Sequence, residues 1–176
     1  MSKQYQKNIV VKYYLFRQKR LFPYFPSLFL DFLRNFAPKL LIKEMDIKEL
    51  LNRTDRFAAN AGCRITEVDE RHAVAVMTVT ASHLNGGNVC QGGALFTLAD
   101  LAIAALMNCQ GQLTFGISNS IIYVASAHEG DTLRAEAVHV SNHHKIPSVE
   151  VSVTNQDNVV VCHVTGLGYR KSSPIK

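Results

Sequence analysis

Residues 91–108 read QGGALFTLADLAIAALMN, and this stretch decides the fold. It is rich in alanine and apolar on almost every face that a helix would present, and a helix of that kind is normally buried. It is shorter than the ~20 apolar residues that a membrane span needs, and it carries Asp100 in its middle. The stretch therefore predicts one long helix inside a protein core.

Strand patterns flank this helix on both sides. Val149, Val151 and Val153 alternate with polar residues, and such a period of two predicts a sheet with one buried face. The strands are expected at 64–68, 73–80, 114–124, 132–140, 148–154 and 159–169, after a first helix at 46–60. Short turns between them favour antiparallel pairing. One helix covers six strands only if the sheet curls around it, so we expect an α+β fold of that form.

The positive charge of the chain is concentrated at its beginning. The net charge is +5, but residues 1–44 carry nine Lys or Arg against two acidic residues, together with ten of the fifteen Phe and Tyr. We therefore interpret 45–176 as the folded domain and 1–44 as a basic, aromatic N-terminal extension. This extension is either merely appended, or a structural arm, or a membrane-surface helix, of which membrane contact is the least expected.

The cysteines and the first residues indicate which cofactors and which cell compartment to expect. The four cysteines lie far apart, and no C-x-x-C or Cys/His cluster has the spacing of metal ligands. We therefore expect free thiols, no metal and no cofactor. Without a secretory signal pattern in the first residues, we expect a cytoplasmic protein. We expect no nucleic-acid partner.

Asp100 is the unusual residue of the central helix. Burying an unpaired carboxylate is costly, so this group must find a partner, face a cleft or change its pKa. It is either a catalytic base or nucleophile, or one half of an ion pair across an interface.

Gly92 and Gly93 open the same helix. Glycines there give a ligand access to free N–H groups that favour negative charge, although a plain helix-start turn is the simpler interpretation. Gly92 and Asp100 lie eight residues apart, or ~12 Å along the helix axis. One reacting group cannot touch both, so a shared site requires two antiparallel helices related by a two-fold axis.

Residues 83–111, HLNGGNVCQGGALFTLADLAIAALMNCQG, resemble the phenylacetate-pathway (PaaI-type) subfamily of hotdog thioesterases. The pattern of that subfamily is an Asn or Gln, six residues later a His followed by two glycines, and an acidic residue nine residues after the His. Asn85, Gln91, Gly92, Gly93 and Asp100 occupy those places with the spacing intact. The resemblance covers about 46–170 and implies the hotdog fold, an antiparallel six-stranded sheet wrapped around a long central helix.

The resemblance also implies roles for individual residues. Asp100 would attack the thioester or activate water, the Gly92 N–H would bind the carbonyl oxygen, and Asn85 would position the water or a neighbouring side chain. The departure is Gln91, which stands where the family usually has His. A Gln amide still donates a hydrogen bond but cannot titrate, so this exchange would lower the activity or abolish it.

Four further residues are candidates for substrate binding: Gly93, His83, His144 and Lys145. His144 and Lys145 lie in a turn that would meet the phosphates of coenzyme A, with a solvated turn as the alternative. In the strand after the helix some relatives carry a hydroxyl residue. Gly116 stands there, with Ser118 and Ser120 nearby, and we assign no role to these three.

The function that the resemblance implies is hydrolysis of acyl-CoA thioesters by a homo-oligomer, either a dimer or a dimer of dimers. One alternative is a non-catalytic acyl-CoA sensor that kept the binding site and lost turnover at Gln91. A hotdog dehydratase is less favoured, because those enzymes use a catalytic His. The acyl group that is cleaved is left open by the sequence.

Overall fold

The computed structural model describes residues 46–175, so the expectations for residues 1–44 lie outside the described part. Two short helices come first, α4 (Ile47–Thr54) and α5 (Arg56–Asn60), and a 3₁₀ turn (Ala81–His83) precedes the long helix α6 (Gly92–Asn108). The strands are β1 (Arg64–Val68), β2 (His72–Thr78), β3 (Gln112–Tyr123), β4 (Thr132–Ser141), β5 (Ser148–Thr154) and β6 (Val160–Pro174).

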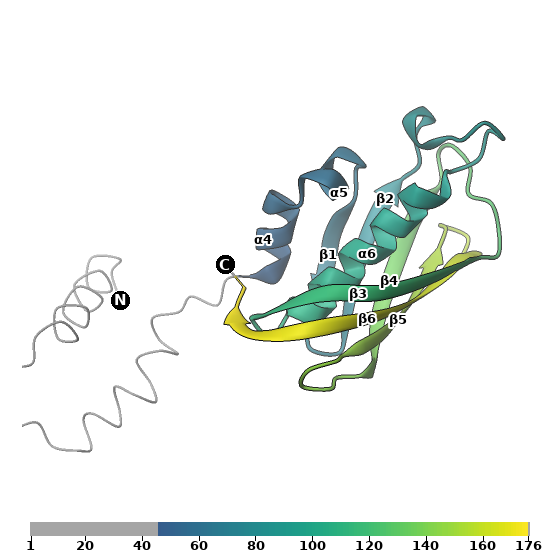
Figure 1. Cartoon of the computed structure of the whole chain (residues 1–176). Coiled ribbons are helices and arrows are strands. Elements are labelled where there is room, and N and C mark those ends of the chain that lie inside the picture. Colours follow the sequence, from purple (N-terminus) through teal and green to yellow (C-terminus); the bar gives the residue numbers. More distant parts are fainter. Residues whose placement is uncertain (1–45, 176) are drawn as a thin grey trace, which may run out of the picture. The chain divides into compact units, whose positions relative to one another are not determined.

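The six strands form one antiparallel sheet in the order β1-β2-β4-β5-β6-β3, and it curves around α6 (Figure 1). The predicted α+β hotdog fold is therefore confirmed. Helix α6 contacts all six strands from the concave side of the sheet. Within residues 46–175, no helix is long and apolar enough to cross a lipid bilayer.

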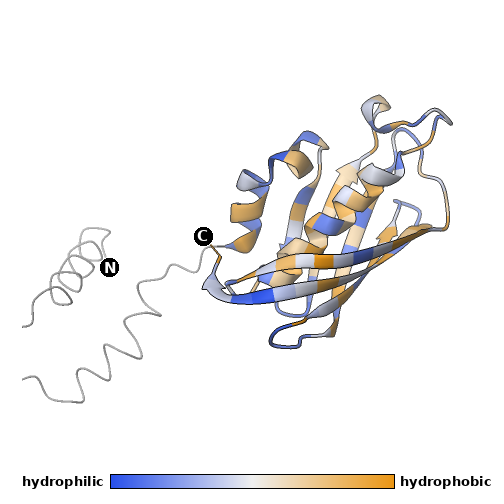
Figure 2. Cartoon of the chain, in the orientation of Figure 1, coloured by the Kyte–Doolittle hydropathy of each residue, from blue (hydrophilic) through white to orange (hydrophobic). Residues whose placement is uncertain are grey.

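The core lies between α6 and the sheet. Ten of the seventeen residues of α6 are buried. The central strands meet the helix with fully buried alanines, Ala73, Ala75, Ala135 and Ala137, and these small side chains let the helix lie close to the sheet. Along the strands, hydrophobic and hydrophilic colours alternate in Figure 2, as the predicted period of two requires.

The predicted helix at 46–60 is in fact two helices. Asp55 ends α4 and begins α5, because its carboxylate accepts a hydrogen bond from the Ala58 N–H at 3.0 Å and caps the new helix. A capping residue in mid-segment favours a break, since its side chain competes with the helical hydrogen bonds.

Strand pairing also differs from the order of the chain. β3 and β4 follow one another in sequence, yet β3 pairs with β6 and forms an edge of the sheet. β6 runs to Pro174, five residues beyond its predicted end, because β3 supplies a partner along this length.

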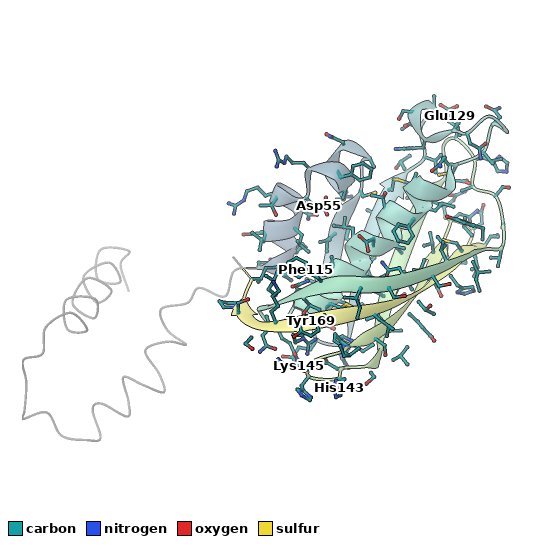
Figure 3. The ribbon with its side chains drawn as sticks, viewed as in Figure 1. Asp55, Phe115, Glu129, His143, Lys145 and Tyr169 are labelled. Atoms are coloured by element: carbon teal, nitrogen blue, oxygen red, sulfur yellow. The ribbon has the colours of Figure 1, made fainter. Side chains whose placement is uncertain are left out.

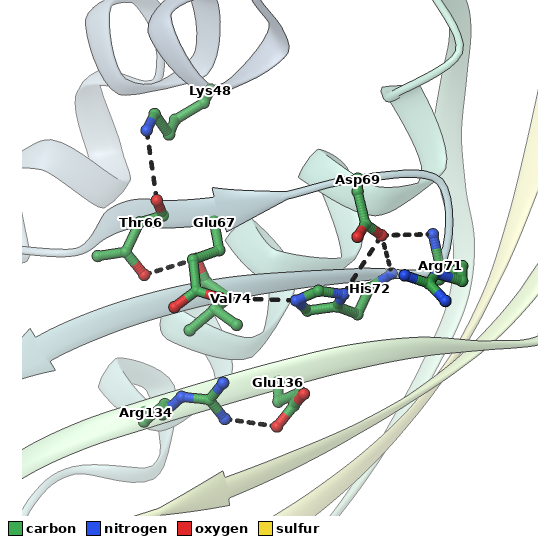
Figure 4. A network of polar contacts seen from close by, with 9 residues as sticks. All are labelled: Lys48, Thr66, Glu67, Asp69, Arg71, His72, Val74, Arg134 and Glu136. Atoms are coloured by element: carbon green, nitrogen blue, oxygen red, sulfur yellow. Dashed lines mark hydrogen bonds and ion pairs between the residues drawn. The ribbon is translucent and has the colours of Figure 1, made fainter.

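Polar contacts hold the hairpin of β1 and β2 at the opposite edge (Figure 4). Asp69 accepts hydrogen bonds from the backbone N–H groups of His72 and Arg71, at 2.9 and 2.7 Å, and these bonds lower the pKa of its carboxyl. The His72 ring also lies within 3.6 Å of Glu67. This turn fixes the pairing register of β1 and β2.

Candidate functional site

At the N-terminus of α6, the Gly92 N–H is a backbone donor without an acceptor among residues 46–175. Gln91 is the N-cap, and its Oε1 accepts a hydrogen bond from the Gly93 N–H. Among residues 46–175, no protein atom accepts a hydrogen bond from the Gly92 N–H or from Gln91 Nε2. The cap thus occupies Gly93 and leaves Gly92 as the available N–H at the positive end of the helix dipole.

Tyr123, on β3, fixes the position of Gly92 from the other side. Its hydroxyl donates to the Gly92 carbonyl at 3.1 Å, and a Cβ on Gly92 would lie 2.7 Å from the Tyr123 oxygen. Only a glycine fits between the helix start and this side chain without a shift, so the sequence GG at this point has a steric reason.

The loop before α6 is folded by its own polar groups. Asn85 Oδ1 accepts from the N–H groups of Gly87 and Val89, at 2.8 and 3.4 Å. The His83 carbonyl accepts from the Gln91 N–H at 2.8 Å, and its ring Nδ1 accepts from the Thr80 N–H at 2.9 Å. Five of the predicted site residues, His83, Asn85, Gln91, Gly92 and Gly93, therefore lie together at one end of the helix.

Asp100 lies two turns further along, on the side of α6 that the sheet does not cover. Asp100 keeps part of its surface exposed in the single chain, as does Gly93, and Phe96, Thr97 and Ala104 on the same side are only partly buried. Asp100 and Gly92 remain ~12 Å apart along one helix axis. One chain by itself does not bring these two residues together.

The surroundings of Asp100 shift the pKa of its carboxyl group. Partial burial raises the pKa of Asp100, and the charge of Asp55 acts in the same direction. A hydrogen bond from Asn119 Nδ2 to Asp100 Oδ1, at 3.0 Å, opposes this shift by stabilising the ionised form. The pKa of Asp100 is thus raised, and Oδ1 accepts the bond from Asn119 while Oδ2 has no hydrogen-bond donor among residues 46–175.

The two remaining candidates, His144 and Lys145, lie in the turn between β4 and β5. Figure 3 labels Lys145 and its neighbour His143 there. The Lys145 carbonyl accepts from the Arg170 N–H at 2.9 Å, and the buried Arg170 side chain reaches Thr114, whose hydroxyl donates to the Met107 carbonyl. This turn therefore belongs to the C-terminal end of α6, away from Gly92 of the same chain.

The strand after the helix contributes Asn119 and Tyr123, and sequence reasoning missed both. From the sequence, the residues considered on this strand were Gly116, Ser118 and Ser120. Of these, Ser118 and Ser120 line a hollow of about 300 Å³ on the outer face of the sheet. The alternation of side chains along β3 could have identified both residues. Asn119 and Tyr123 occupy odd positions, opposite in parity to Ser118 and Ser120, and face α6. Within residues 46–175, no group of three or more His, Cys, Asp or Glu side chains is arranged to hold a metal ion.

Comparison with known proteins identifies the family of the chain. The model of the thioesterase superfamily matches residues 81–162. The acyl-coenzyme A thioesterase PaaI of Escherichia coli K12 is 38% identical over 117 residues, 66% of this chain and 83% of that protein. The solved structure of the E. coli PaaI protein from the phenylacetic acid degradation operon superposes with a TM-score of 0.70 at 33% identity, over 73% of this chain and 93% of that one.

Another solved structure that the chain resembles is that of a Streptococcus mutans UA159 protein bound to acetyl-CoA. It has a TM-score of 0.60 at 25% identity, over 63% of this chain and 90% of that one. Sequence similarity, the curled sheet around α6 and the match across the loop, helix and strands lead to one conclusion. The chain belongs to the thioesterase superfamily and is a hotdog-fold thioester hydrolase of the PaaI type.

Proposed function

We propose that this protein hydrolyses acyl-CoA thioesters in a homodimer, with Asp100 of one subunit and the Gly92 N–H of the other acting on the same carbonyl group. The observation that carries the proposal is the position of Asp100. It is a carboxylate with a raised pKa on a strip of the core helix that residues 46–175 leave uncovered. The relatives named for acyl-CoA thioesterase activity and bound to acetyl-CoA support this substrate class.

The edge strand β3 supports the dimer. It is twelve residues long, and Ile117 and Ile122 on it are 57% and 63% exposed in the single chain. A long, apolar, unprotected edge is expected to pair with another strand. Antiparallel pairing of β3 with its copy would bring the uncovered strips of the two α6 helices face to face about a two-fold axis.

The hydrolysis mechanism follows from the groups at this dimer interface. Asp100 takes a proton from water as the water oxygen attacks the thioester carbon, and the oxyanion that forms accepts a hydrogen bond from the partner Gly92 N–H. The C–S bond then breaks, and the proton that Asp100 took from water passes to the sulfur, so coenzyme A leaves as the thiol. In the second form of the mechanism, Asp100 itself attacks and the C–S bond breaks with loss of the coenzyme A thiolate. Water then hydrolyses the acyl anhydride, which yields the free acid and restores the Asp100 carboxylate.

The remaining predicted residues have supporting positions in this proposal. Gln91 Nε2 has no acceptor among residues 46–175 and could donate to the thioester carbonyl, and Asn85 and His83 border the same end of the helix. In an antiparallel helix pair, the turn with His144 and Lys145 comes to the partner's Gly92 end, where a phosphate of coenzyme A would meet the lysine. A dimer of dimers would repeat this site without changing it. The four free cysteines fit a cytoplasmic setting.

Thiol release from aryl-, short-chain and long-chain acyl-CoAs by the purified full-length protein tests the proposal. We expect Asp100→Asn to lower kcat by about 10²–10⁴-fold, since it removes a general base while keeping the shape of the side chain. Tight acyl-CoA binding without thiol release, unaltered by Asp100→Asn, would instead establish the non-catalytic sensor.

A further inference from the structure

Asn119 donates a hydrogen bond to Asp100 in an arrangement that lowers the stability of the fold. Its Nδ2 donates to Asp100 Oδ1 across the gap between β3 and α6, and its own Oδ1 is buried without a hydrogen-bond partner among residues 46–175. A buried polar atom without a partner destabilises the folded state, because it has lost its hydrogen bonds to water. An apolar side chain at this position would avoid that cost, so a role beyond stability is the better explanation for Asn119.

The orientation of the amide is fixed by chemistry. If the Asn119 amide were flipped, its oxygen would face the Asp100 carboxylate, and two acceptors would repel each other while Nδ2 lost its partner. The orientation with the donor toward Asp100 is therefore the stable one whenever Asp100 is ionised. The unpaired Oδ1 is the consequence.

Gly166 provides the space for this amide. It is the register partner of Asn119 on β6, and a Cβ there would lie 2.8 Å from Asn119 Oδ1. The same Cβ would lie 3.1 Å from Ile103 and 3.2 Å from Val149, so it has nowhere else to go. Any larger residue at Gly166 would push the Asn119 amide away from its present place.

We propose that Asn119, seated over Gly166, is a positioning residue that holds one oxygen of Asp100 and so aims the other oxygen at the reacting thioester or water. This inference rests on the proposed role of Asp100 and deepens it. The bond restricts the rotation of the Asp100 carboxylate, and because an amide does not titrate, the restraint persists over the whole working pH range.

The test compares Asn119→Leu and Asn119→Ala with Ser120→Ala, a matched control on the same strand that points to the outer face. We expect both Asn119 variants to lower kcat by about 10–100-fold with KM changed by less than about 3-fold. The acidic limb of the rate profile should move to higher pH, because the donor that favours the ionised carboxylate is gone. The melting temperature of Asn119→Leu should not fall.

A second line of evidence comes from Gly166→Ala, which leaves every hydrogen-bonding group in place and should lower kcat in the same way by displacing the amide. In an Asp100→Asn background, Asn119→Leu should have no further effect on the residual rate. The inference is overturned if the Asn119 variants keep the wild-type kcat and acidic limb, or if their effect adds fully to that of Asp100→Asn. Loss of the proposed function itself would be seen separately, as an Asp100→Asn protein with undiminished turnover.

Discussion

Replacement of Gly92 by proline removes one N–H group from the start of α6 without breaking a helical hydrogen bond. Gly92 is the first residue of α6, where proline is tolerated because no helical hydrogen bond needs its N–H. Gln91, which precedes it, is already extended, with φ −67° and ψ 135°, as a residue before proline should be. The Gly92 N–H has no acceptor among residues 46–175, so folding loses no hydrogen bond there.

Gly92→Ala is the matched control, because it adds the same Cβ but keeps the N–H. In both variants the Cβ would lie 2.7 Å from the Tyr123 oxygen, and the half-exposed Tyr123 ring must move. Losing its hydrogen bond to the Gly92 carbonyl costs roughly 0.5–1.5 kcal/mol in each variant. The difference between proline and alanine therefore isolates the N–H donor.

We expect the proline variant to have a kcat about 10²–10³-fold below that of the alanine variant, the usual cost of removing one oxyanion donor. Thiol release from the best acyl-CoA of the panel measures this difference, and thermal melting checks that the two variants fold equally well. Equal kcat values for the two would refute the assignment of Gly92 as the oxyanion donor.

Mixing two inactive proteins then tests whether the site spans two subunits. A heterodimer of Gly92→Pro and Asp100→Asn chains carries one site with both defects and one site with neither. Random mixing of equal amounts should therefore restore about one quarter of the wild-type activity, since half of the dimers are mixed and each has one intact site. No recovery after exchange of subunits would place both groups in one chain.

Two other predictions follow from named contacts. The acidic limb of kcat/KM should lie above the ~3.9 of an ordinary Asp, because burial raises the pKa of Asp100 and activity is lost as pH falls through that raised value; a limb at or below pH 4 in a rate–pH profile would contradict this. Gly168→Ala should lower the free energy of unfolding by ~1–3 kcal/mol, because its Cβ would lie 2.5 Å from Met107 Sδ and 2.8 Å from Thr114 Cγ2. Urea denaturation measures this loss against Gly86→Ala, whose Cβ would meet nothing within 4 Å.

The long helix and most of the strands were predictable from local pattern. The helix expected at 91–108 begins at Gly92 with Gln91 as its cap, and the strand expected at 148–154 has those bounds in the structure. Both predictions rest on the spacing of apolar residues, which reflects the helical and strand periods directly. The break at Asp55 was not predicted. The spacing of apolar residues does not show that the Asp55 side chain competes with the backbone hydrogen bonds that would continue the helix.

The residues around Asp100 were only partly predictable. Asn85, Gln91, Gly92 and Gly93 lie close together in the sequence, so their gathering at one helix end follows from local geometry. Asn119 is nineteen residues from Asp100, and its contact depends on which way the turn after α6 leads and on the parity of β3. A shift of one residue in that strand would have turned Ser118 or Ser120 toward the helix instead.

The sequence by itself determined a buried helix that opens on two glycines, carries one acid, and is accompanied by six antiparallel strands. These features are set by interactions between residues near one another in the chain, and the resemblance in residues 83–111 added the family. Only the tertiary structure decided that β3 lies at the sheet edge, that Asp100 faces outward from the concave side, and that Asn119 holds it above Gly166. The order of the strands and the face on which each side chain lies depend on packing between segments that are distant in sequence. The periodicity of one segment does not indicate which other segment it will pack against.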